Sequence, residues 1–375
     1  MEIIHIVLGK ANPNRMNGVN KVVFQLANHQ ALSGKQVSVW GITRDTTHNY
    51  PSRNFKTQLF KAYKNLFKID RALIKAIEDR EGKAVVFHIH GGWIPTFSIL
   101  SKYLKRSNLP FVFTPHGAYN TIARLKSKRL KAFYFRLFER PLLKRAAAIH
   151  CIGGSEVSGL NEIFSTQKTQ LIPYGYESNN NVLKHKQGNK GDFIVGFLGR
   201  LDIHTKGLDL LLEAFATFSK EVSKAQLWII GDSEQRGQLE ERVSMLGLED
   251  HVILWGKKFG EAKYDLLRQM DVFAHPSRNE GLPSSVLEAA DLGVPCLITE
   301  ATNVGPWISS FNSGIVVENE NVQALGKGLF DLYAQWKTST YTSKRNAASQ
   351  MVKEAFNWKT IVASFDDLYT PQIAL

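Results

Sequence analysis

The chain has 375 residues, a net charge of +13 and a hydrophobic content of 43%, which supports about two globular domains with cores of their own. No stretch approaches the roughly 20 apolar residues of a membrane span, and the apolar start of the chain is too short for a secretory signal. The two cysteines, Cys151 and Cys296, exclude a disulfide framework. We therefore expect a cytoplasmic protein, with only peripheral contact to the inner face of the cell membrane.

Positive charge is concentrated in the first half of the chain. Residues 1–180 contain 27 Lys and Arg against 10 Asp and Glu, whereas the remaining residues contain 20 against 24. This asymmetry predicts an acidic partner for the first half, such as an anionic membrane surface, a phosphorylated acceptor or a nucleic acid.

The first 90 residues have the pattern of alternating strands and helices, at 3–8, 20–33, 36–42, 53–83 and 85–89. The expected helix at 53–83 is rich in Lys and Arg. Gly18 lies where the first strand turns into a helix, and it lets the backbone approach a ligand closely. The G-x-G-x-x-G fingerprint is absent from this turn, which argues against a nicotinamide cofactor.

Three histidines lie in or directly after predicted strands of the first half. His88 and His90 share one face of their strand, but no third ligand is near them in sequence, so we expect no metal site there. His116 comes after the strand at 111–114, with Pro115 before it and a glycine after it. An isolated histidine is more often structural, but this placement favours an imidazole that points into a cleft.

Residues 124–145 predict a basic amphipathic helix. Its apolar side chains follow the spacing of one helix face: Leu130, Phe133, Tyr134, Leu137 and Phe138. Its other faces carry cations: Lys126, Lys128, Arg129, Lys131, Arg136 and Arg140. The apolar face could simply pack on the sheet. The cations favour an anionic membrane over a nucleic acid, because we find neither a helix-turn-helix nor an RNA-stacking signature.

The second half begins with a strand at 193–198. Gly199 allows a turn after it, and Arg200 and Lys206 flank the following loop. Two such cations can bind a diphosphate together, the guanidinium as a fork and the ammonium as a point charge. A strand at 252–255 then leads into a loop with Gly256 and Lys257.

The most informative stretch is 277–299, in which a loop and a helix follow the strand at 272–274. It contains Glu280 in the loop and Glu288 in the helix. Carboxylates only accept hydrogen bonds and suit sugar hydroxyls, whereas a helix N-terminus at the carboxyl end of a parallel strand suits phosphate. A sugar nucleotide offers both kinds of group.

The string E-G-L-P-x-x-x-x-E followed by A-x-x-x-G-V-P, from Glu280 to Pro295, resembles the signature of the family 4 retaining glycosyltransferases. The resemblance implies an α/β fold of the GT-B type, with two Rossmann-like domains that face each other across a deep cleft. Expected boundaries are 1–175 for the acceptor-side domain, 176–192 for a linker, 193–355 for the nucleotide-sugar domain, and 356–375 for a helix that crosses back onto the first domain.

The resemblance also implies roles for individual residues. His116 and Glu280 are the expected catalytic residues, the former beside the transferred sugar and the latter on its hydroxyls, and Glu288 is expected on the ribose. The expected donor-binding residues are Asn17, Gly18, Gly199, Arg200, Lys206, Gly256, Lys257, Gly281, Leu282 and Glu288. Two positions depart from the family pattern: Lys206 is six residues after Arg200 where five is commoner, and Pro283 replaces a frequent glycine.

These patterns predict a retaining glycosyltransferase that moves a sugar from a UDP- or GDP-sugar to a saccharide or lipid-linked acceptor in surface-polysaccharide or lipopolysaccharide assembly. No Asp-x-Asp pair is present, so we expect no metal and no other cofactor. One alternative is a GT-B sugar-nucleotide epimerase, which would use the same donor site. An alternative of another class is a basic nucleic-acid-binding protein.

Overall fold

The computed structural model describes residues 1–12, 18–119, 128–178 and 191–372. The chain forms two compact units. Unit 1 consists of Met1–Gly175 together with Trp358–Leu375, and unit 2 consists of Tyr176–Asn357. Most of the expected linker at 176–192 lies outside the described residues.

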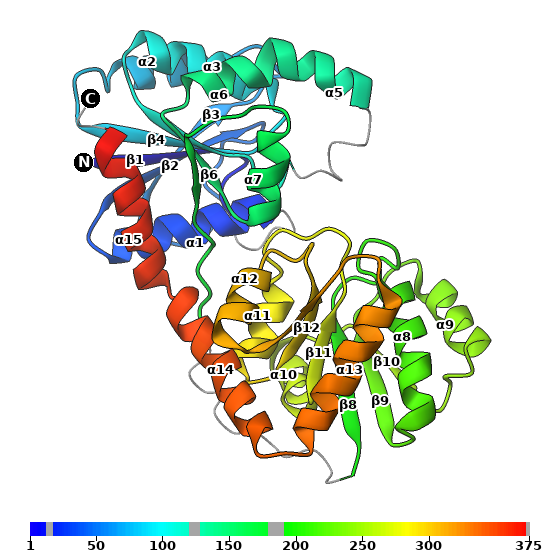
Figure 1. Cartoon of the computed structure of the whole chain (residues 1–375). Helices are drawn as coiled ribbons and strands as arrows, with labels where there is room; N and C mark the ends of the chain where they lie inside the picture. The colour runs from blue at the N-terminus through cyan, green and yellow to red at the C-terminus, as the bar shows by residue number, and fades with distance from the viewer. Residues whose placement is uncertain (13–17, 120–127, 179–190, 373–375) are drawn as a thin grey trace. The chain divides into compact units, whose positions relative to one another are not determined.

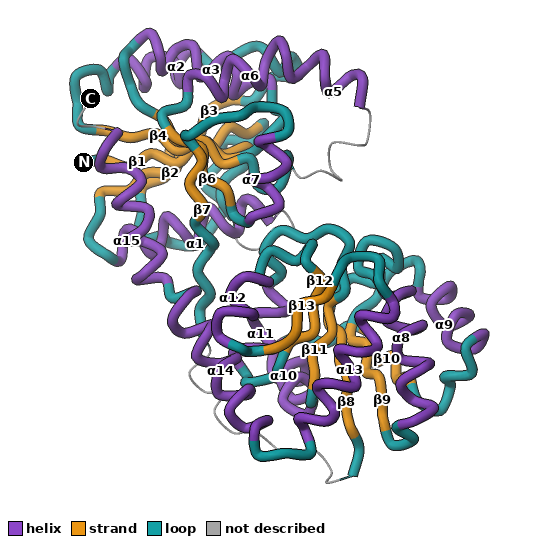
Figure 2. Tube along the Cα trace, viewed as in Figure 1, coloured by secondary structure: helices purple, strands orange, loops and turns teal. Residues whose placement is uncertain are grey.

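Unit 1 contains a seven-stranded parallel sheet in the order β3-β2-β1-β4-β5-β6-β7 (Figure 2). Its strands are β1 (Glu2–Leu8), β2 (Gln36–Thr43), β3 (Lys56–Lys61), β4 (Val85–His90), β5 (Phe111–Thr114), β6 (Ala148–Cys151) and β7 (Thr169–Leu171). The strand order reverses between β1 and β4, and ligands of open α/β sheets bind beyond the carboxyl ends of the strands at such a point.

Helices cover both faces of this sheet (Figure 1). One face packs against α1 (Gly18–Leu32) and α15 (Trp358–Tyr369). The other face packs against α2 (Arg71–Glu78), α3 (Pro95–Arg106), α6 (Arg140–Arg145) and α7 (Gly154–Asn161). A helix α5 (Lys128–Tyr134) and a π-helical turn (Phe135–Glu139) lead directly into α6, and a 3-10 turn (Thr370–Gln372) follows α15.

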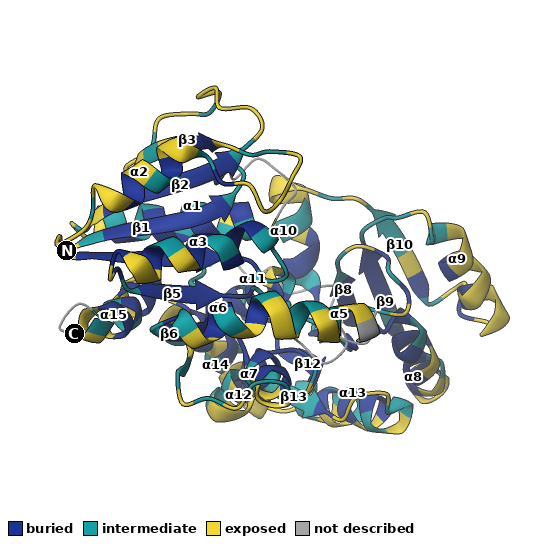
Figure 3. Cartoon of the chain, turned by 90° about the horizontal axis from the view of Figure 1, so that it is seen from above, coloured by how far each residue is buried: buried dark blue, intermediate teal, exposed yellow. Residues whose placement is uncertain are grey.

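The inner strands of the sheet are largely buried on both faces, as parallel strands between two helical layers must be, and Figure 3 shows this for β1 and β2. In β1, Ile4 and Ile6 join the core under α2 and α3, whereas Ile3 and Val7 join the core under α1 and α15. This alternation determines which helix each side chain of the sheet faces.

The prediction of one helix over residues 53–83 is wrong. Residues 56–61 form the edge strand β3, which pairs with β2 along its whole length, and α2 begins only at Arg71. Only Phe60 of this strand is buried, and most of its other side chains are polar. An edge strand needs few apolar residues, so its spaced cations resemble an exposed helix face.

Unit 2 contains a six-stranded parallel sheet in the order β10-β9-β8-β11-β12-β13. Its strands are β8 (Phe193–Leu198), β9 (Ala225–Ile230), β10 (Val252–Gly256), β11 (Val272–His275), β12 (Cys296–Thr299) and β13 (Gly314–Val317). One face carries α8 (Leu208–Glu221), α9 (Arg236–Met245) and α13 (Val322–Trp336). The other carries α10 (Gly260–Gln269), α11 (Ser284–Asp291), α12 (Gly305–Phe311) and α14 (Thr340–Ala355).

Both sheets have the strand order of a Rossmann fold, with reversals between β1 and β4 and between β8 and β11. The prediction of an α/β protein with two Rossmann-like units is therefore confirmed. Among the described residues, we find no helix that combines the length and the apolar character needed to cross a membrane.

Candidate functional site

Three side chains meet at the reversal point of unit 2. Lys206, in the loop between β8 and α8, forms an ion pair with the Oε1 atom of Glu280, in the loop after β11. The same oxygen accepts a hydrogen bond from Nε2 of His275, the last residue of β11, at 3.1 Å. Lys206 and Glu280 are 17% and 18% exposed, whereas His275 is buried. A ligand can therefore reach the acid and the ammonium, while the imidazole supports the acid from within the fold.

The carboxylate of Glu280 is ionised at neutral pH. Burial raises its pKa, but the hydrogen bond from His275 and the charge of Lys206 outweigh burial and lower the pKa to about 2. Burial lowers the pKa of His275, so this imidazole is neutral and its Nε2–H is the donor. Its Nδ1 atom is buried and has no hydrogen-bond partner among the described residues. Glu280 is thus an oriented acceptor, as sugar hydroxyls require.

Contacts between the two loops hold Lys206 against Glu280. Arg278 donates to both carboxylate oxygens of Asp209, in the first turn of α8, at 2.7 and 2.9 Å, and its Nε donates to Glu320 at 2.6 Å. The backbone N–H of Arg278 and the hydroxyl of Ser277 both donate to the carbonyl of Thr205. A forked guanidinium fixes orientation as well as distance, so the relative position of the loops is well determined.

Gly207 allows the closest approach of these loops. It has φ +65°, and a Cβ atom there would lie 2.0 Å from the carbonyl oxygen of Pro276. On the other side of the site, Pro283 is the N-cap of α11, one position before its first helical residue, Ser284. Gly281 and Leu282 lie between Glu280 and this cap, half-buried.

The structure separates the two predicted diphosphate cations. Lys206 reaches Glu280 despite the longer spacing from Arg200. The Arg200 side chain is 70% exposed and pairs with Asp202 at 2.9 Å, two residues further along the loop. This loop begins at Gly199. A Cβ atom on Gly231, which follows β9, would lie 1.8 Å from the carbonyl oxygen of Gly199, so the two segments approach closely where they leave β8 and β9.

Glu288 has a different partner from Glu280. Its Oε2 atom accepts from the ammonium of Lys263, on α10, at 2.6 Å, and both side chains are 17% exposed. On the β10 side, Gly256 adopts φ +68° and its carbonyl accepts from Gly231 at 3.0 Å. Lys257 pairs with Asp232 at 3.6 Å and is 62% exposed. These residues stay predictions for donor binding.

In unit 1, His116 follows β5 and adopts φ +56°, a conformation that is uncommon for a residue with a side chain. Its loop is held by Glu156 of α7, whose carboxylate accepts from the backbone N–H of Gly117 and, at 3.2 Å, from that of Ile152. The His116 ring bonds His90 through Nε2 at 3.0 Å and Tyr174 through Nδ1 at 3.1 Å. Burial lowers its pKa to about 3, so the ring is neutral.

The remaining predicted residues of unit 1 are only partly placed. Gly18 is the exposed first residue of α1, two residues before the predicted helix start. Asn17 lies outside the described residues. Asn20, the third residue of α1, is buried, and its Oδ1 accepts a hydrogen bond from the backbone N–H of Ala11 at 2.8 Å. Asn20 thus ties the start of α1 to the chain that leaves β1.

The structure brings a third imidazole to His88 and His90. His5, on β1, lies opposite His88 in the strand register, and ring nitrogens of the three residues lie within 4.8 Å of one another. The sequence could not show this, because His5 is far from the pair along the chain. Each ring, however, also bonds a side chain outside the trio: Gln30, Tyr369 or His116. These contacts occupy nitrogens that a metal would need.

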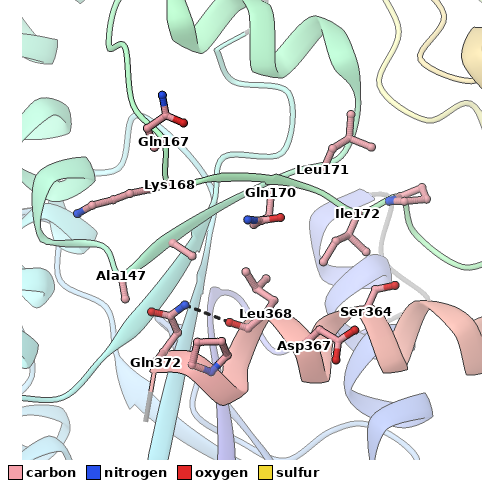
Figure 4. A pocket seen from close by; sticks show the side chains of 13 residues that line it. Ala147, Gln167, Lys168, Gln170, Leu171, Ile172, Ser364, Asp367, Leu368 and Gln372 are labelled. Atoms are coloured by element: carbon pink, nitrogen blue, oxygen red, sulfur yellow. Dashed lines mark hydrogen bonds between the residues drawn. The ribbon is translucent and has the colours of Figure 1, made fainter. Parts of the chain in front are cut away.

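Unit 1 also has a hollow beside β7 and α15 (Figure 4). Gln170 and Ile172 line it from the strand side, and Ser364, Asp367 and Leu368 line it from the helix side. It contains none of the predicted site residues.

Comparison with known proteins identifies the class. A profile described as "Glycosyl transferases group 1" matches residues 179–350, and one described as "Glycosyltransferase Family 4" matches residues 16–179. The chain therefore belongs to the family 4 glycosyltransferases, the retaining enzymes of the GT-B fold that use nucleotide-sugar donors. The family that the Glu280 motif suggested is thereby confirmed.

Individual relatives are distant. An uncharacterized glycosyltransferase of Methanocaldococcus jannaschii is 27% identical over 278 residues, and the match covers 69% of this chain and 64% of that protein. A GDP-mannose:cellobiosyl-diphosphopolyprenol alpha-mannosyltransferase of Xanthomonas oryzae is 24% identical over 98% of this chain and 96% of its own length. The Anabaena protein HepE, solved with UDP and with UDP-glucose, gives TM-scores of 0.74 and 0.67 at 14% identity, over 99% of this chain and 100% of that chain. The likeness to HepE shows the fold alone.

Several side chains of these sites escaped sequence analysis: His5, Glu156, Tyr174, Lys263, His275 and Arg278. His275 and Arg278 flank the recognised motif and lie within five residues of Glu280, so proximity was an available signal. Glu156, Tyr174 and Lys263 come from other elements and left no signal in the sequence.

Replacing Gly207 by alanine should separate the two loops of unit 2. The left-handed φ and the backbone oxygen at 2.0 Å leave no space for a methyl group, so we expect a loss of about 1–3 kcal/mol in the free energy of unfolding. Thermal unfolding measures this. The matched control is Gly237→Ala on α9, where no atom of the described residues lies within 4 Å of the added carbon and alanine should be neutral or stabilising. Equal effects of the two variants would contradict the close approach.

The stability of the protein should fall as the pH is lowered from 6.5 to 5. Burial lowers the pKa of His5, His88, His90, His116 and His150 below the ordinary 6.5. Below pH 6.5 the unfolded chain takes up protons that the folded unit excludes, and each such proton lowers the free energy of unfolding by about 1.4 kcal/mol per pH unit.

Two carboxyls of unit 1 act in the opposite direction. Burial raises the pKa of Glu139 and Glu156 to about 7, so these groups favour the folded state as the pH falls from 7 to 4.5. They are fewer than the histidines, so the net slope keeps its sign. A melting temperature that is flat or rises toward pH 5 would contradict this expectation, and a His150→Gln variant should show a shallower slope.

Proposed function

We propose that this protein transfers a sugar, with retention, from a UDP- or GDP-sugar to a saccharide or lipid-linked acceptor in cell-surface polysaccharide biosynthesis. The observation that carries the proposal is the oriented carboxylate of Glu280, held between Lys206 and His275 at the carboxyl ends of β8 and β11. Ligands of open α/β sheets bind at that place.

Each group of this trio has a role in the proposed reaction. Glu280 accepts hydrogen bonds from hydroxyls of the donor sugar, because it is ionised and can only accept. Lys206 stabilises negative charge on the diphosphate as the bond to the sugar breaks, and being already in place it costs little reorganisation. His275 keeps the carboxylate oriented and does not reach the ligand, since it is buried.

Glu288 and His116 complete the proposed donor contacts. Glu288 would accept from ribose hydroxyls, with Lys263 as its support. His116 would lie beside the transferred sugar, as the family resemblance implies. We assign no side chain as a nucleophile. By analogy with the family, the acceptor attacks the sugar from the same face from which the nucleotide leaves.

The acceptor proposal rests on relatives and on a surface of unit 1. The Xanthomonas relative is named for a diphosphopolyprenol acceptor, which is lipid-linked. Five of the exposed large apolar side chains of unit 1 come from two segments, and we call them the apolar patch: Leu66, Phe67, Leu130, Phe133 and Leu137. Phe67 contacts Phe138 of the α5–α6 helix, with ring centroids 5.1 Å apart, so the two segments of the patch are neighbours.

Cations surround this apolar patch. Exposed Lys64 and Lys68 flank its first segment; exposed Arg136 lies within its second segment, and exposed Arg140 follows it. The alternative in which the apolar face of the helix packs on the sheet does not apply to Leu130, Phe133 and Leu137, of which Leu130 is 71% exposed. Apolar side chains within a basic rim suit the surface of an anionic membrane, where a lipid-linked acceptor would be presented.

The role of Glu280 can be tested with Glu280→Gln. The amide has the same shape but no charge, so it neither pairs with Lys206 nor accepts at both of its ends. We expect the rate of sugar transfer to fall by at least about 100-fold. Glu213→Gln, at an exposed position of α8, is the control and should transfer normally. Activity of Glu280→Gln near that of the control would remove the acid from the reaction.

The donor and the reaction class can be identified together. Thermal unfolding with UDP, GDP and ADP should show stabilisation by one nucleotide, which Lys206→Met should weaken and Lys220→Met, further along α8, should not. Incubation of the favoured nucleotide sugar without acceptor then separates transfer from epimerisation. A changed sugar on an intact nucleotide would contradict the proposed transfer.

Membrane contact can be tested by flotation with vesicles that contain anionic lipid. The protein should float at low salt, and Leu130→Ser and Phe133→Ser should each weaken binding by about tenfold, because a buried apolar side chain contributes about 1.5–3 kcal/mol. Met245→Ser is the control, since Met245 is 85% exposed in unit 2. If the unaltered protein does not float, or if Met245→Ser weakens binding equally, the apolar patch is not a membrane-binding surface.

A further inference from the structure

A row of polar side chains lies on one face of the unit 1 sheet, beneath α1 and α15. His5 on β1, His88 and His90 on β4, Thr114 on β5 and His150 on β6 are all at most 1% exposed. The opposite face of the same strands is apolar. Burying a polar group costs free energy unless it is hydrogen-bonded, so the partners of this row matter.

One end of the row has a fixed direction. The backbone carbonyl of Ile172 can only accept, so His150 donates to it through Nε2 at 2.7 Å. The Nδ1 atom of this neutral ring must then accept from the hydroxyl of Thr114 at 2.7 Å, and that oxygen accepts from Nε2 of His88 at 2.5 Å. His88 Nδ1 in turn accepts from the phenol of Tyr369 at 2.7 Å.

The series of hydrogen bonds continues through the helices to the predicted site. The Tyr369 oxygen, having donated, accepts from the Gln30 amide nitrogen at 3.5 Å, so Gln30 Oε1 accepts from His5 Nε2 at 2.7 Å. His5 Nδ1 accepts from His90 Nε2 at 2.9 Å, and His90 Nδ1 accepts from His116 Nε2 at 3.0 Å. His116 is therefore left with Nδ1 as its acceptor.

Every imidazole in this series then carries its proton on Nε2. Burial lowers the pKa of His5 and His150 to about 4 and that of His116 to about 3, so the rings are neutral as the argument requires. In this structure, Nδ1 of His116 accepts a hydrogen bond from the hydroxyl of Tyr174 at 3.1 Å.

We propose that this hydrogen-bonded series fixes His116 as the Nε2–H tautomer, and that Gln30 and Tyr369 are positioning residues for sugar transfer. The proposal rests on the proposed function, in which His116 lies beside the transferred sugar. With Nδ1 as the acceptor, a sugar hydroxyl can replace Tyr174 as donor to this ring. A phosphate oxygen without a proton cannot, so the tautomer selects a hydroxyl over the leaving diphosphate.

Gln30 is the point at which the series can reverse. An amide offers a donor at one end and an acceptor at the other, and Tyr369 decides which end faces His5. Without the phenol oxygen the amide can turn, present N–H to His5 Nε2 and move the protons of His5, His90 and His116 to Nδ1. A side chain of α15 would thus act on His116 through a series of partners.

The tautomers can be measured without any substrate. In the full chain labelled with nitrogen-15 in histidine, protonated and unprotonated ring nitrogens give separate signals, and His116→Gln assigns the His116 signals. We expect His116 to be neutral with the proton on Nε2, and Tyr369→Phe to populate the Nδ1–H form. Tyr341→Phe is the matched control, because this buried phenol donates to Asp271 in unit 2. A charged His116, an Nδ1–H form in the unaltered protein, or no change in Tyr369→Phe overturns the proposal.

Kinetics then test the positioning role. Tyr369→Phe and Gln30→Met should each lower kcat by about tenfold, the effect of one hydrogen bond, while the KM for the donor stays within about twofold. Tyr341→Phe should change neither constant. If Tyr369→Phe shifts the tautomer but leaves kcat unchanged, the positioning role is overturned. If no nucleotide sugar is used at all, the proposed function fails while the tautomer result still stands.

A bound metal is the remaining way to explain three close imidazoles. A divalent ion at His5, His88 and His90 would take the lone pairs that the series uses. Purified protein that retains one equivalent of zinc, and loses it in His5→Gln, would overturn the series.

Discussion

The ion pair between Lys206 and Glu280 is the interaction on which the candidate site of unit 2 depends. Two charges that are mostly removed from water are costly unless each has a partner, and here each is the partner of the other. Arg278, through Asp209 and Glu320, supplies the rigidity that keeps them together. A ligand that enters must offer a new partner to both charges. In the proposed function, the donor does so, with phosphate for the ammonium and hydroxyls for the carboxylate.

The two units use the same sheet topology in different ways. In unit 2 the polar groups lie in loops beyond the carboxyl ends of β8 and β11, where solvent and ligand can reach them. In unit 1 the polar groups extend from His116 back under the helices, along the face of the sheet. Part of the core of unit 1 thus consists of hydrogen-bonded polar side chains, which orient the loop residue His116. The neighbouring carboxyl of Glu156 adds to this by holding the next backbone amide.

Most element positions could be predicted from the sequence, because they depend on local patterns of apolar and polar residues. The fold class could be predicted because the Glu280 motif resembles a known family. Apolar runs such as 193–198 and 272–274 have the length and composition typical of buried strands, and Glu280 lies in a string whose spacing is distinctive. The edge strand β3 was missed because a single buried residue, Phe60, distinguishes it. The partners of predicted residues were also missed. Lys263 reaches Glu288 and Tyr174 reaches His116 only through tertiary packing, which no local pattern records.

Unit 1 is discontinuous in the chain, since α15 returns to it after the whole of unit 2. Tyr369, near the end of that helix, closes the polar row by bonding both His88 and Gln30. During synthesis, the first 175 residues can therefore build their sheet while this row still lacks α15, which is part of its cover, and stays accessible to water on that side. Folding of unit 1 to its final state must wait until unit 2 has been translated, so assembly of the enzyme is ordered in time by the position of one helix in the gene product.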